Sequence, residues 1–277
     1  DQTVREGDTV SLSGSFTDPG VNDTHTETWS VVANNGDVIP DGSGSTFDFT
    51  PVDNGTYTVT YTVTDNDGDS DSDEVVVTVD NVAPQNVNAG VDQTVREGDT
   101  VSLTGSFTDP GVNDTHTETW TVVASNGDVI PDGSGSTFDF TPNGSGTYTV
   151  TYSVTDNNGD FARDEVIVTV ENTAPVLDTF VSDADSLTTK SDDNTVSVSG
   201  TFSDFGLGSH TVLIDWGDGT TPTEANVDQA SDAFEATHDY DTGGIFTITA
   251  TVVDASGLTS NMEATTGIVT GVGLVDG

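Results

Sequence analysis

The chain has 277 residues, of which 48 are acidic and 4 basic, so its formal net charge at pH 7 is −44. Nucleic acids and anionic membranes bind basic surfaces, and this charge therefore excludes both as simple electrostatic partners. The absence of cysteine excludes disulfides, zinc–thiolate centres and cysteine nucleophiles. The sequence has no run of about 18 apolar residues of the kind that inserts directly into a membrane.

The first predicted elements are strands in which polar and apolar residues alternate. Val10–Phe16 alternates in this way, and Thr56–Val63 does so with threonine on one face and tyrosine or valine on the other. Glu74–Val79 predicts a further strand, and clusters of Gly, Pro, Asn and Asp separate these runs. We find no helical period. About seven short strands in a unit of roughly 91 residues are typical of an immunoglobulin-like sandwich, so we predict an all-β fold.

The sequence repeats itself. Asp1–Ala33 returns at Asp92–Ala124 with two differences, Ser13 against Thr104 and Ser30 against Thr121. A divergent third copy follows, and the predicted units are 1–82, 83–173 and 174–277. We therefore expect three tandem sandwiches in an elongated array. Because unit one begins abruptly, we also expect the chain to be part of a longer array.

Aromatic residues strengthen the prediction of immunoglobulin-like units. Tyr57 and Tyr148 have the spacing of a tyrosine corner, the conserved turn in which a tyrosine hydroxyl bonds the backbone before strand F. Trp29 and Trp120 suit the core tryptophan of strand C. In the third unit Phe246 replaces the corner tyrosine and cannot form that hydrogen bond.

Three stretches of the third unit carry a family resemblance. Ile214–Thr220, the His238–Tyr240 segment and Gly244–Asp254 resemble the signature stretches of PKD (polycystic kidney disease) repeats. Units one and two share the last stretch but lack the Trp-Gly-Asp-Gly turn. The resemblance implies an immunoglobulin-like fold in a bacterial or archaeal surface or secreted protein. Similar proteins use such repeats as extracellular spacers, adhesive modules or accessory domains of secreted hydrolases.

Acidic and amide residues gather in turns that the topology brings to the ends of the units. The N-terminus, the B–C loop and the F–G loop of such a sandwich share one end, so the linkers should meet these loops. Several oxygen ligands with few basic neighbours suit Ca²⁺, and the linker resembles those of calcium-stiffened cadherin arrays. The candidate ligands are Asp80, Asn81, Asp109, Asp114, Asp156 and Asp160 at the first junction, Glu171, Asn172, Asp204 and Asp254 at the second, and Asp18, Asp23, Asp65, Asp67 and Asp69 in unit one.

Two other interpretations of these aspartates remain open. Aspartate is favoured in turns because its side chain bonds its own backbone, and acidic, lysine-poor chains also arise by adaptation to high salt. The threonine-rich outer face of Thr56–Val63 weighs against the second interpretation, because the charge is concentrated in loops.

Signals of catalysis are weak. Asp241-Thr-Gly matches the aspartic-protease tripeptide but occurs once, whereas that dyad needs two such loops. His25 and His116 are more typical of surface histidines than of a metal cluster. We therefore predict a non-catalytic extracellular or cell-surface array that acts as a spacer or as a building block of an adhesin, fibre or S-layer. Its partners would be neighbouring repeats, further copies, or a cell-surface or carbohydrate ligand. The alternative is a carbohydrate-binding accessory module of a secreted hydrolase.

Overall fold

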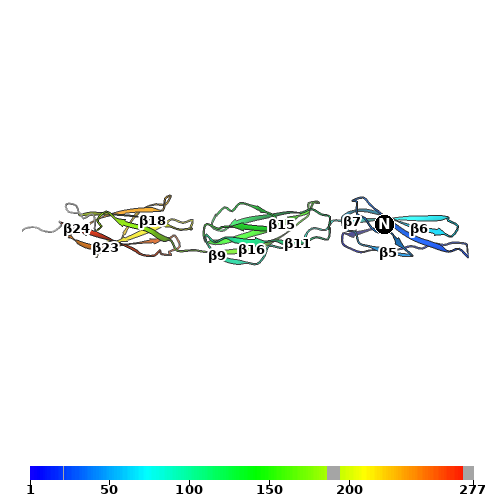
Figure 1. The fold of residues 1–277 in the computed structure, drawn as a ribbon, viewed down its shortest axis with the longest axis horizontal. Helices are drawn as coiled ribbons and strands as arrows, with labels where there is room; N and C mark the ends of the chain where they lie inside the picture. The colour runs from blue at the N-terminus through cyan, green and yellow to red at the C-terminus, as the bar shows by residue number, and fades with distance from the viewer. Residues whose placement is uncertain (21, 186–193, 271–277) are drawn as a thin grey trace, which may run out of the picture.

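The structure is a computed structural model that describes residues 1–20, 22–185 and 194–270. Within these ranges it contains strands and no helix. Figure 1 shows three β-sandwiches that follow one another end to end as an elongated rod. The predicted all-β fold and its tandem, elongated arrangement are confirmed.

Unit one is built from a large sheet and a small one. Its strands are β1 (Gln2–Arg5), β2 (Val10–Ser13), β3 (His25–Ala33), β4 (Gly42–Ser43), β5 (Thr46–Phe49), β6 (Gly55–Asp65) and β7 (Ser70–Asp80). The large sheet has the order β1-β7-β6-β3-β4, and β2 pairs with β5 in the other layer. Strand β1 is parallel to β7, so both strands end at the end of the sandwich that faces unit two.

Unit two repeats this arrangement and adds one strand at its start. Its strands are β8 (Gln85–Asn88), β9 (Gln93–Arg96), β10 (Val101–Thr104), β11 (Ser106–Thr108), β12 (Thr117–Ala124), β13 (Gly133–Ser134), β14 (Thr137–Phe140), β15 (Gly146–Thr155) and β16 (Phe161–Glu171). The large sheet has the order β13-β12-β15-β16-β9, and β10 pairs with β14. The added strand β8 pairs with β11.

Unit three has two four-stranded sheets. Its strands are β17 (Val176–Ser182), β18 (Thr195–Ser203), β19 (Thr211–Asp215), β20 (Thr223–Glu224), β21 (Asn226–Asp228), β22 (Ala233–Asp239), β23 (Gly244–Val253) and β24 (Glu263–Val269). The sheet orders are β17-β18-β22-β21 and β20-β19-β23-β24.

Alternating residues of the strands form the cores. Tyr57 and Val59 in β6 are fully buried, and Tyr61 packs against Trp29 with ring centroids 4.5 Å apart. The indole nitrogen of Trp29 donates to the carbonyl oxygen of Gly44 at 2.7 Å, so this buried ring leaves no unpaired donor. The predicted strand at Thr56–Val63 and the predicted core tryptophan of strand C are thus confirmed.

The tyrosine corner is present in units one and two. The hydroxyl of Tyr57 donates to the carbonyl oxygen of Asp53 at 2.8 Å, and that of Tyr148 donates to Gly144 at the same distance. In unit three the ring of Phe246 stacks on Tyr240 at 4.1 Å. The hydroxyl of Tyr240 bonds the carbonyl oxygen of Trp216 at 2.8 Å, so a different tyrosine ties down this sandwich.

Candidate cation site between units one and two

Glu6 lies at the point where unit one meets the linker. In the parallel pairing of β1 with β7, Arg5 lies opposite Asp80, so the residues that follow the two strands are neighbours. The backbone N–H of Glu6 donates to the carbonyl oxygen of Asp80 at 3.1 Å. The linker residue Val82 donates its N–H to Oε1 of Glu6 at 2.7 Å. Glu6 is therefore held against the linker by backbone contacts.

The second carboxylate oxygen of Glu6 has no partner. The side chain is 2% exposed, and its Oε2 atom is buried without a hydrogen bond among the described residues. A buried acceptor without a donor costs free energy. This oxygen is therefore available to a ligand.

Unit two contributes two aspartates from the loop between β11 and β12. Asp109 accepts a hydrogen bond from the N–H of Gly111 at 3.0 Å and contacts Nε2 of His116 at 2.9 Å. Both carboxylate oxygens of Asp114 are buried and lack a hydrogen-bond partner among the described residues. One carboxylate is thus fixed in place, and the other has both oxygens free.

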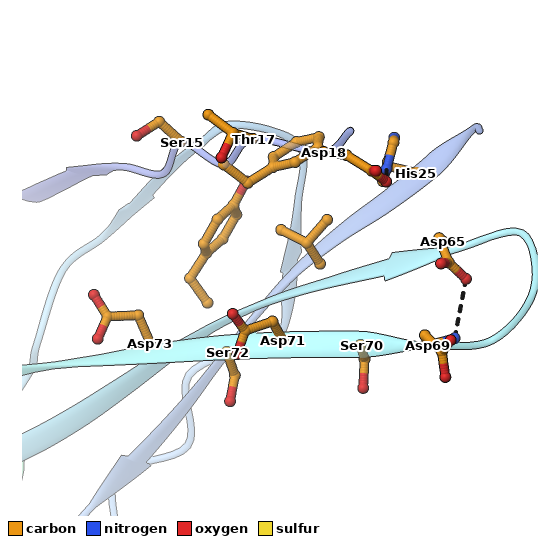
Figure 2. A pocket seen from close by; sticks show the side chains of 13 residues that line it. Ser15, Thr17, Asp18, His25, Asp65, Asp69, Ser70, Asp71, Ser72 and Asp73 are labelled. Carbon is orange, nitrogen blue, oxygen red and sulfur yellow. Dashed lines mark hydrogen bonds and ion pairs between the residues drawn. The ribbon is translucent and has the colours of Figure 1, made fainter. Parts of the chain in front are cut away.

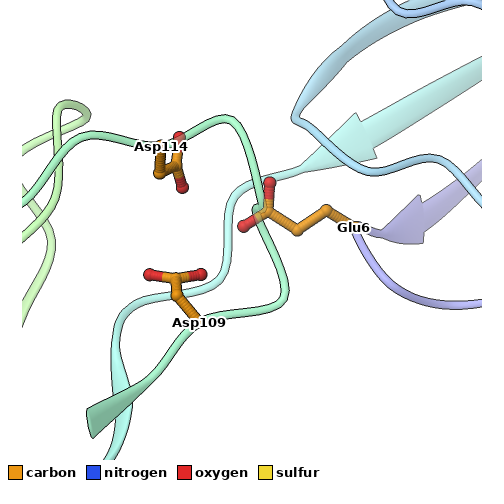
Figure 3. Close-up of side chains that lie close together, drawn as sticks. All are labelled: Glu6, Asp109 and Asp114. Atoms are coloured by element: carbon orange, nitrogen blue, oxygen red, sulfur yellow. The ribbon is translucent and has the colours of Figure 1, made fainter. Parts of the chain in front are cut away.

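The three carboxylates meet across the junction. One ligand oxygen from each of Glu6, Asp109 and Asp114 lies within 4.8 Å of the others. Figure 3 shows the side chain of Glu6 reaching from unit one toward the loop that carries both aspartates. A β-carbon at Gly111 would lie 2.4 Å from Oδ2 of Asp114 and 3.0 Å from Oε1 of Glu6. Glycine at this position leaves the carboxylates room to converge.

Asn81 adds an amide oxygen from the linker. Its Nδ2 donates to Oδ2 of Asp156 and to Oδ2 of Asp160, both at 2.9 Å. Carboxylates only accept hydrogen bonds, so the amide nitrogen must face them. Its Oδ1 is buried and has no hydrogen-bond partner among the described residues. The linker is thereby hydrogen-bonded to the turn after β15, while the amide oxygen of Asn81 has no hydrogen-bond partner among the described residues.

The local electrostatics disfavour negative charge in this site. The pKa of Glu6 is raised to about 7, chiefly by burial; the N–H of Val82 lowers it, and the carboxylates of Asp114 and Asp109 contribute to raising it. Burial and the charge of Asp109 also raise the pKa of Asp114. Crowded carboxylates of this kind become stable when they take up a proton or coordinate a cation. Hard cations such as Ca²⁺ and Mg²⁺ bind oxygen ligands of this type.

The second junction has a related but smaller set of groups. Glu97 takes the place of Glu6: it is 3% exposed, Oε1 accepts from the N–H of Thr173 at 2.7 Å, and Oε2 has no partner among the described residues. Oδ1 of Asp204 is likewise unpaired, and its Oδ2 contacts His210 at 2.7 Å. The matching loop is one residue shorter from its aspartate to its histidine, and Ser209 follows Asp204 at the distance at which Asp114 follows Asp109, so one carboxylate is missing.

The other candidate residues of the second junction lie close to these groups. Asn172 donates to Oδ2 of Asp254 at 2.7 Å and to the hydroxyl of Ser256 at 2.8 Å. Asp80 and Glu171 accept through their backbone carbonyls, from Glu6 and Glu97, and both residues are exposed. Sequence reasoning named Asp80, Asn81, Glu171 and Asn172 as candidate ligands of the linkers and did not name Glu6 and Glu97, which bond to two of them.

The candidate residues of unit one lie outside the two junctions. Asp18 contacts Nε2 of His25 and accepts from the N–H of Gly20, both at 2.6 Å. Asp65 accepts from the N–H groups of residues 67, 68 and 69 at 2.8–2.9 Å, which is the bonding of a turn aspartate. Asp67 and Asp69 are exposed, and Asp23 is half-buried beside Gly20.

Comparison with protein-family models identifies the repeats. The model of the K319L-like PKD domain matches residues 1–79 and 89–170. The chain belongs to this family. Domains of this kind are generally non-catalytic structural modules and are typical of extracellular proteins. Within the described ranges the structure contains no helix with the length and hydrophobicity of a membrane-spanning segment.

Solved structures of tandem sandwich domains are similar to the chain at low identity. The I67–I69 fragment from titin is 13% identical, covers 98% of this chain and 95% of its own, and has a TM-score of 0.38. The fibronectin(III)-like modules of Clostridium thermocellum CbhA are 15% identical, cover 61% of this chain and 89% of their own, and have a TM-score of 0.27. A search of curated proteins found no match.

Proposed function

We propose that the chain is a non-catalytic extracellular spacer whose units are held in line by Ca²⁺ at their junctions. The observation that carries this proposal is that buried oxygens of Glu6, Asn81 and Asp114, from both sides of one junction, have no hydrogen-bond partner among the described residues. Such a spacer functions by holding its two ends a set distance apart, and the stiffness of its joints maintains that distance. A surface adhesin, a fibre or an S-layer are the assemblies in which we expect it.

The type and number of ligands favour Ca²⁺ over other cations. Ca²⁺ accepts six to eight oxygens in flexible geometry, and carboxylates, amide oxygens and water are its usual ligands. Three carboxylates converge at the first junction, so water would supply the remaining ligands. Mg²⁺ demands tighter octahedral geometry and retains more of its water. Thiolate-binding metals have no cysteine to bind.

The ion would act as a joint. Glu6 belongs to unit one, and Asp109 and Asp114 belong to unit two, so an ion between them links the two sandwiches. Without it, the same carboxylates repel one another in a chain of charge −44. A ligand that binds the ordered state alone stabilises it by about 2.7 kcal/mol at a hundredfold excess over its Kd.

The carbohydrate-binding alternative has less support. Sugar-binding faces are usually built from exposed aromatic rings, whereas Trp29, Trp120 and Trp216 are at most 3% exposed. Exposed phenylalanines occur singly, as Phe16, Phe161 and Phe205 on different units. We therefore retain the spacer as the proposed function.

Small-angle X-ray scattering tests this proposal. The maximum dimension and thermal midpoint should fall in EDTA and recover with Ca²⁺, but not with NaCl of equal ionic strength. The Asp114→Asn variant should lose most of this response. Asp23→Asn changes the matching residue of unit one, which lies at no described junction, and should retain it. If NaCl restores the dimension as well as Ca²⁺ does, the aspartates act as a screened acidic surface and the proposal fails.

A further inference from the structure

The outer face of the large sheet of unit two differs in charge from the chain as a whole. The outward-facing residues of β9, β12, β15 and β16 are mostly threonine. Two arginines and two glutamates accompany them, Arg96, Arg163, Glu165 and Glu171, so the formal charges of this face cancel. The whole chain has a net charge of −44. Two chains that approach through this face therefore avoid the repulsion expected from their overall charge.

Alternate residues of β16 form a row of apolar and charged side chains on this face. Phe161 is 62% exposed, Arg163 and Glu165 are exposed, and Ile167 is half-buried. Side chains two apart on a strand point to the same face. In the described parts of the chain the ion pairs are those of histidines with aspartates. Arg163 thus has no ion-pair partner there.

The row is complementary to a second copy of itself. Two such rows can lie face to face in opposite directions, about a twofold axis midway between positions 163 and 165. Phe161 of each copy then faces Ile167 of the other, and Arg163 of each copy faces Glu165 of the other. A twofold contact repeats every pair reciprocally in this way. Each central pair joins opposite charges, and each outer pair joins apolar groups.

The matching strand of unit one has a different row. Residues 70–72 differ from residues 161–163 at all three positions, although the two repeats are otherwise very similar. Ser70 and Ser72 stand in the places of the phenylalanine and the arginine, and Figure 2 shows both serines on the same side of β7. The glutamate is retained as Glu74. Two copies of this row would bring no opposite charges together.

A neighbouring strand widens the apolar end of the row in unit two. Val123 of β12 is 72% exposed and lies in line with Thr149 and Ile167 across the sheet. In the antiparallel arrangement Phe161 of one copy therefore meets an apolar area formed by Val123 and Ile167 of the other. Aromatic residues and arginine are enriched at interfaces between proteins.

We propose that two copies of this chain associate through the outer faces of their second units, with Arg163 of each copy bound to Glu165 of the other. The strands run along the rod (Figure 1), and aligned sheets pack at about 30° to one another. The two rods therefore cross at unit two and diverge, which keeps the acidic first and third units of the two copies apart. The inference goes beyond the proposed function, because the contact requires no cation.

Sedimentation velocity of the full chain over about a hundredfold range of concentration tests this inference. The parent chain should shift from monomer to dimer as the concentration rises. Arg163→Glu and Glu165→Arg each place like charges opposite one another, so either should raise the dissociation constant by about tenfold or more. A mixture of the two variants should form a heterodimer, because one row then carries two acidic side chains and the other two basic ones.

Glu74→Arg is the matched control, because it makes the same change of charge on the corresponding strand of unit one. This variant should dimerise as the parent chain does. All three substituted side chains are exposed, so the thermal midpoints should stay close to that of the parent and show that the chains are folded.

Three outcomes would overturn the inference: a parent chain that stays monomeric, single variants that dimerise like the parent, or a mixture of them that stays monomeric. Dimerisation should also persist in EDTA, and a dimer that requires Ca²⁺ would contradict the inference as well. Loss of the Ca²⁺ response at the first junction with an unchanged dimer would count against the proposed function alone.

Discussion

At the scale of single residues, the tyrosine corner links the stability of unit one to pH. Tyr57 is fully buried, and burial raises the pKa of its phenol to about 12. Tyr61, whose hydroxyl bonds Glu27, has a pKa raised to about 12 by burial as well. The folded state therefore holds these protons more tightly than the unfolded chain, whose tyrosines titrate near 10.

The sign of this shift predicts alkaline unfolding. The stabilisation is complete below the unfolded pKa of about 10 and is lost as pH rises toward about 12. The urea concentration at the unfolding midpoint of unit one should therefore decrease as the pH is raised from about 9 to about 11. Tyr57→Phe should lower the free energy of unfolding at neutral pH by about 1–2 kcal/mol. It should also weaken the dependence of the urea midpoint on alkaline pH. A midpoint that is flat across this range would contradict the role of burial.

Gly111 is a second residue whose effect can be isolated. A methyl group there would press on the carboxylates of Asp114 and Glu6. We expect Gly111→Ala to remove most of the increase in thermal midpoint that Ca²⁺ produces. Gly20→Ala is the matched control, because a methyl group at Gly20 meets Asp23 in the same loop of unit one. If both variants respond to Ca²⁺ as the parent chain does, the carboxylates at the first junction are not ligands.

At the scale of elements, the linkers are the parts that set the joint. Asn81 ties the first linker to Asp156 and Asp160 in the turn after β15, and Asn172 ties the second to Asp254 and Ser256 in the turn after β23. Each linker is thus bonded to the following unit and, through Glu6 or Glu97, to the preceding one.

Loss of the side-chain amide of one linker asparagine should loosen the joint in which that asparagine lies. Asn81→Ala removes two hydrogen bonds to the carboxylates of Asp156 and Asp160. We expect the amides of Val82 and Glu6 to exchange faster, by a factor of ten or more, which corresponds to about 1.5–3 kcal/mol for charged hydrogen bonds. Asn172→Ala should have this effect at the second joint alone. Equal changes at both joints in either variant would mean that the amides do not act locally.

At the scale of the whole molecule, the two joints differ in the number of carboxylates. Asp114 completes the first site, and Ser209 stands in its place at the second. Phe205 and Leu207 pack on Gly98 and Gly144 there, which gives the second joint apolar contacts of its own. The rod should therefore be stiffened by Ca²⁺ mainly between units one and two.

This difference can be reversed by one substitution. Ser209→Asp supplies the missing carboxylate, and calorimetric titration should then report a second Ca²⁺ site or tighter binding at the second junction, by about tenfold or more. Asp114→Asn in the same background should leave that second site as the stronger one. If Ser209→Asp changes neither the affinity nor the number of bound ions, carboxylate count does not govern the joints.

Much of this architecture follows from the sequence alone. The repeat of Asp1–Ala33 at Asp92–Ala124 and the alternation of Thr56–Val63 are local signals, and they correctly predicted tandem all-β sandwiches with Trp29 and Tyr57 in the core. The convergence of linker and loop residues also followed, because strand order in this fold is regular. Asn81 does meet Asp156 and Asp160.

Tertiary structure alone decided which oxygens face the junction. Glu6 is followed by glycine in an ordinary turn, and nothing in its local sequence marks it as buried. It becomes a candidate ligand because the parallel pairing of β1 with β7 places it against Val82. Local patterns determine strands and turns, whereas burial depends on what packs against them from elsewhere in the chain.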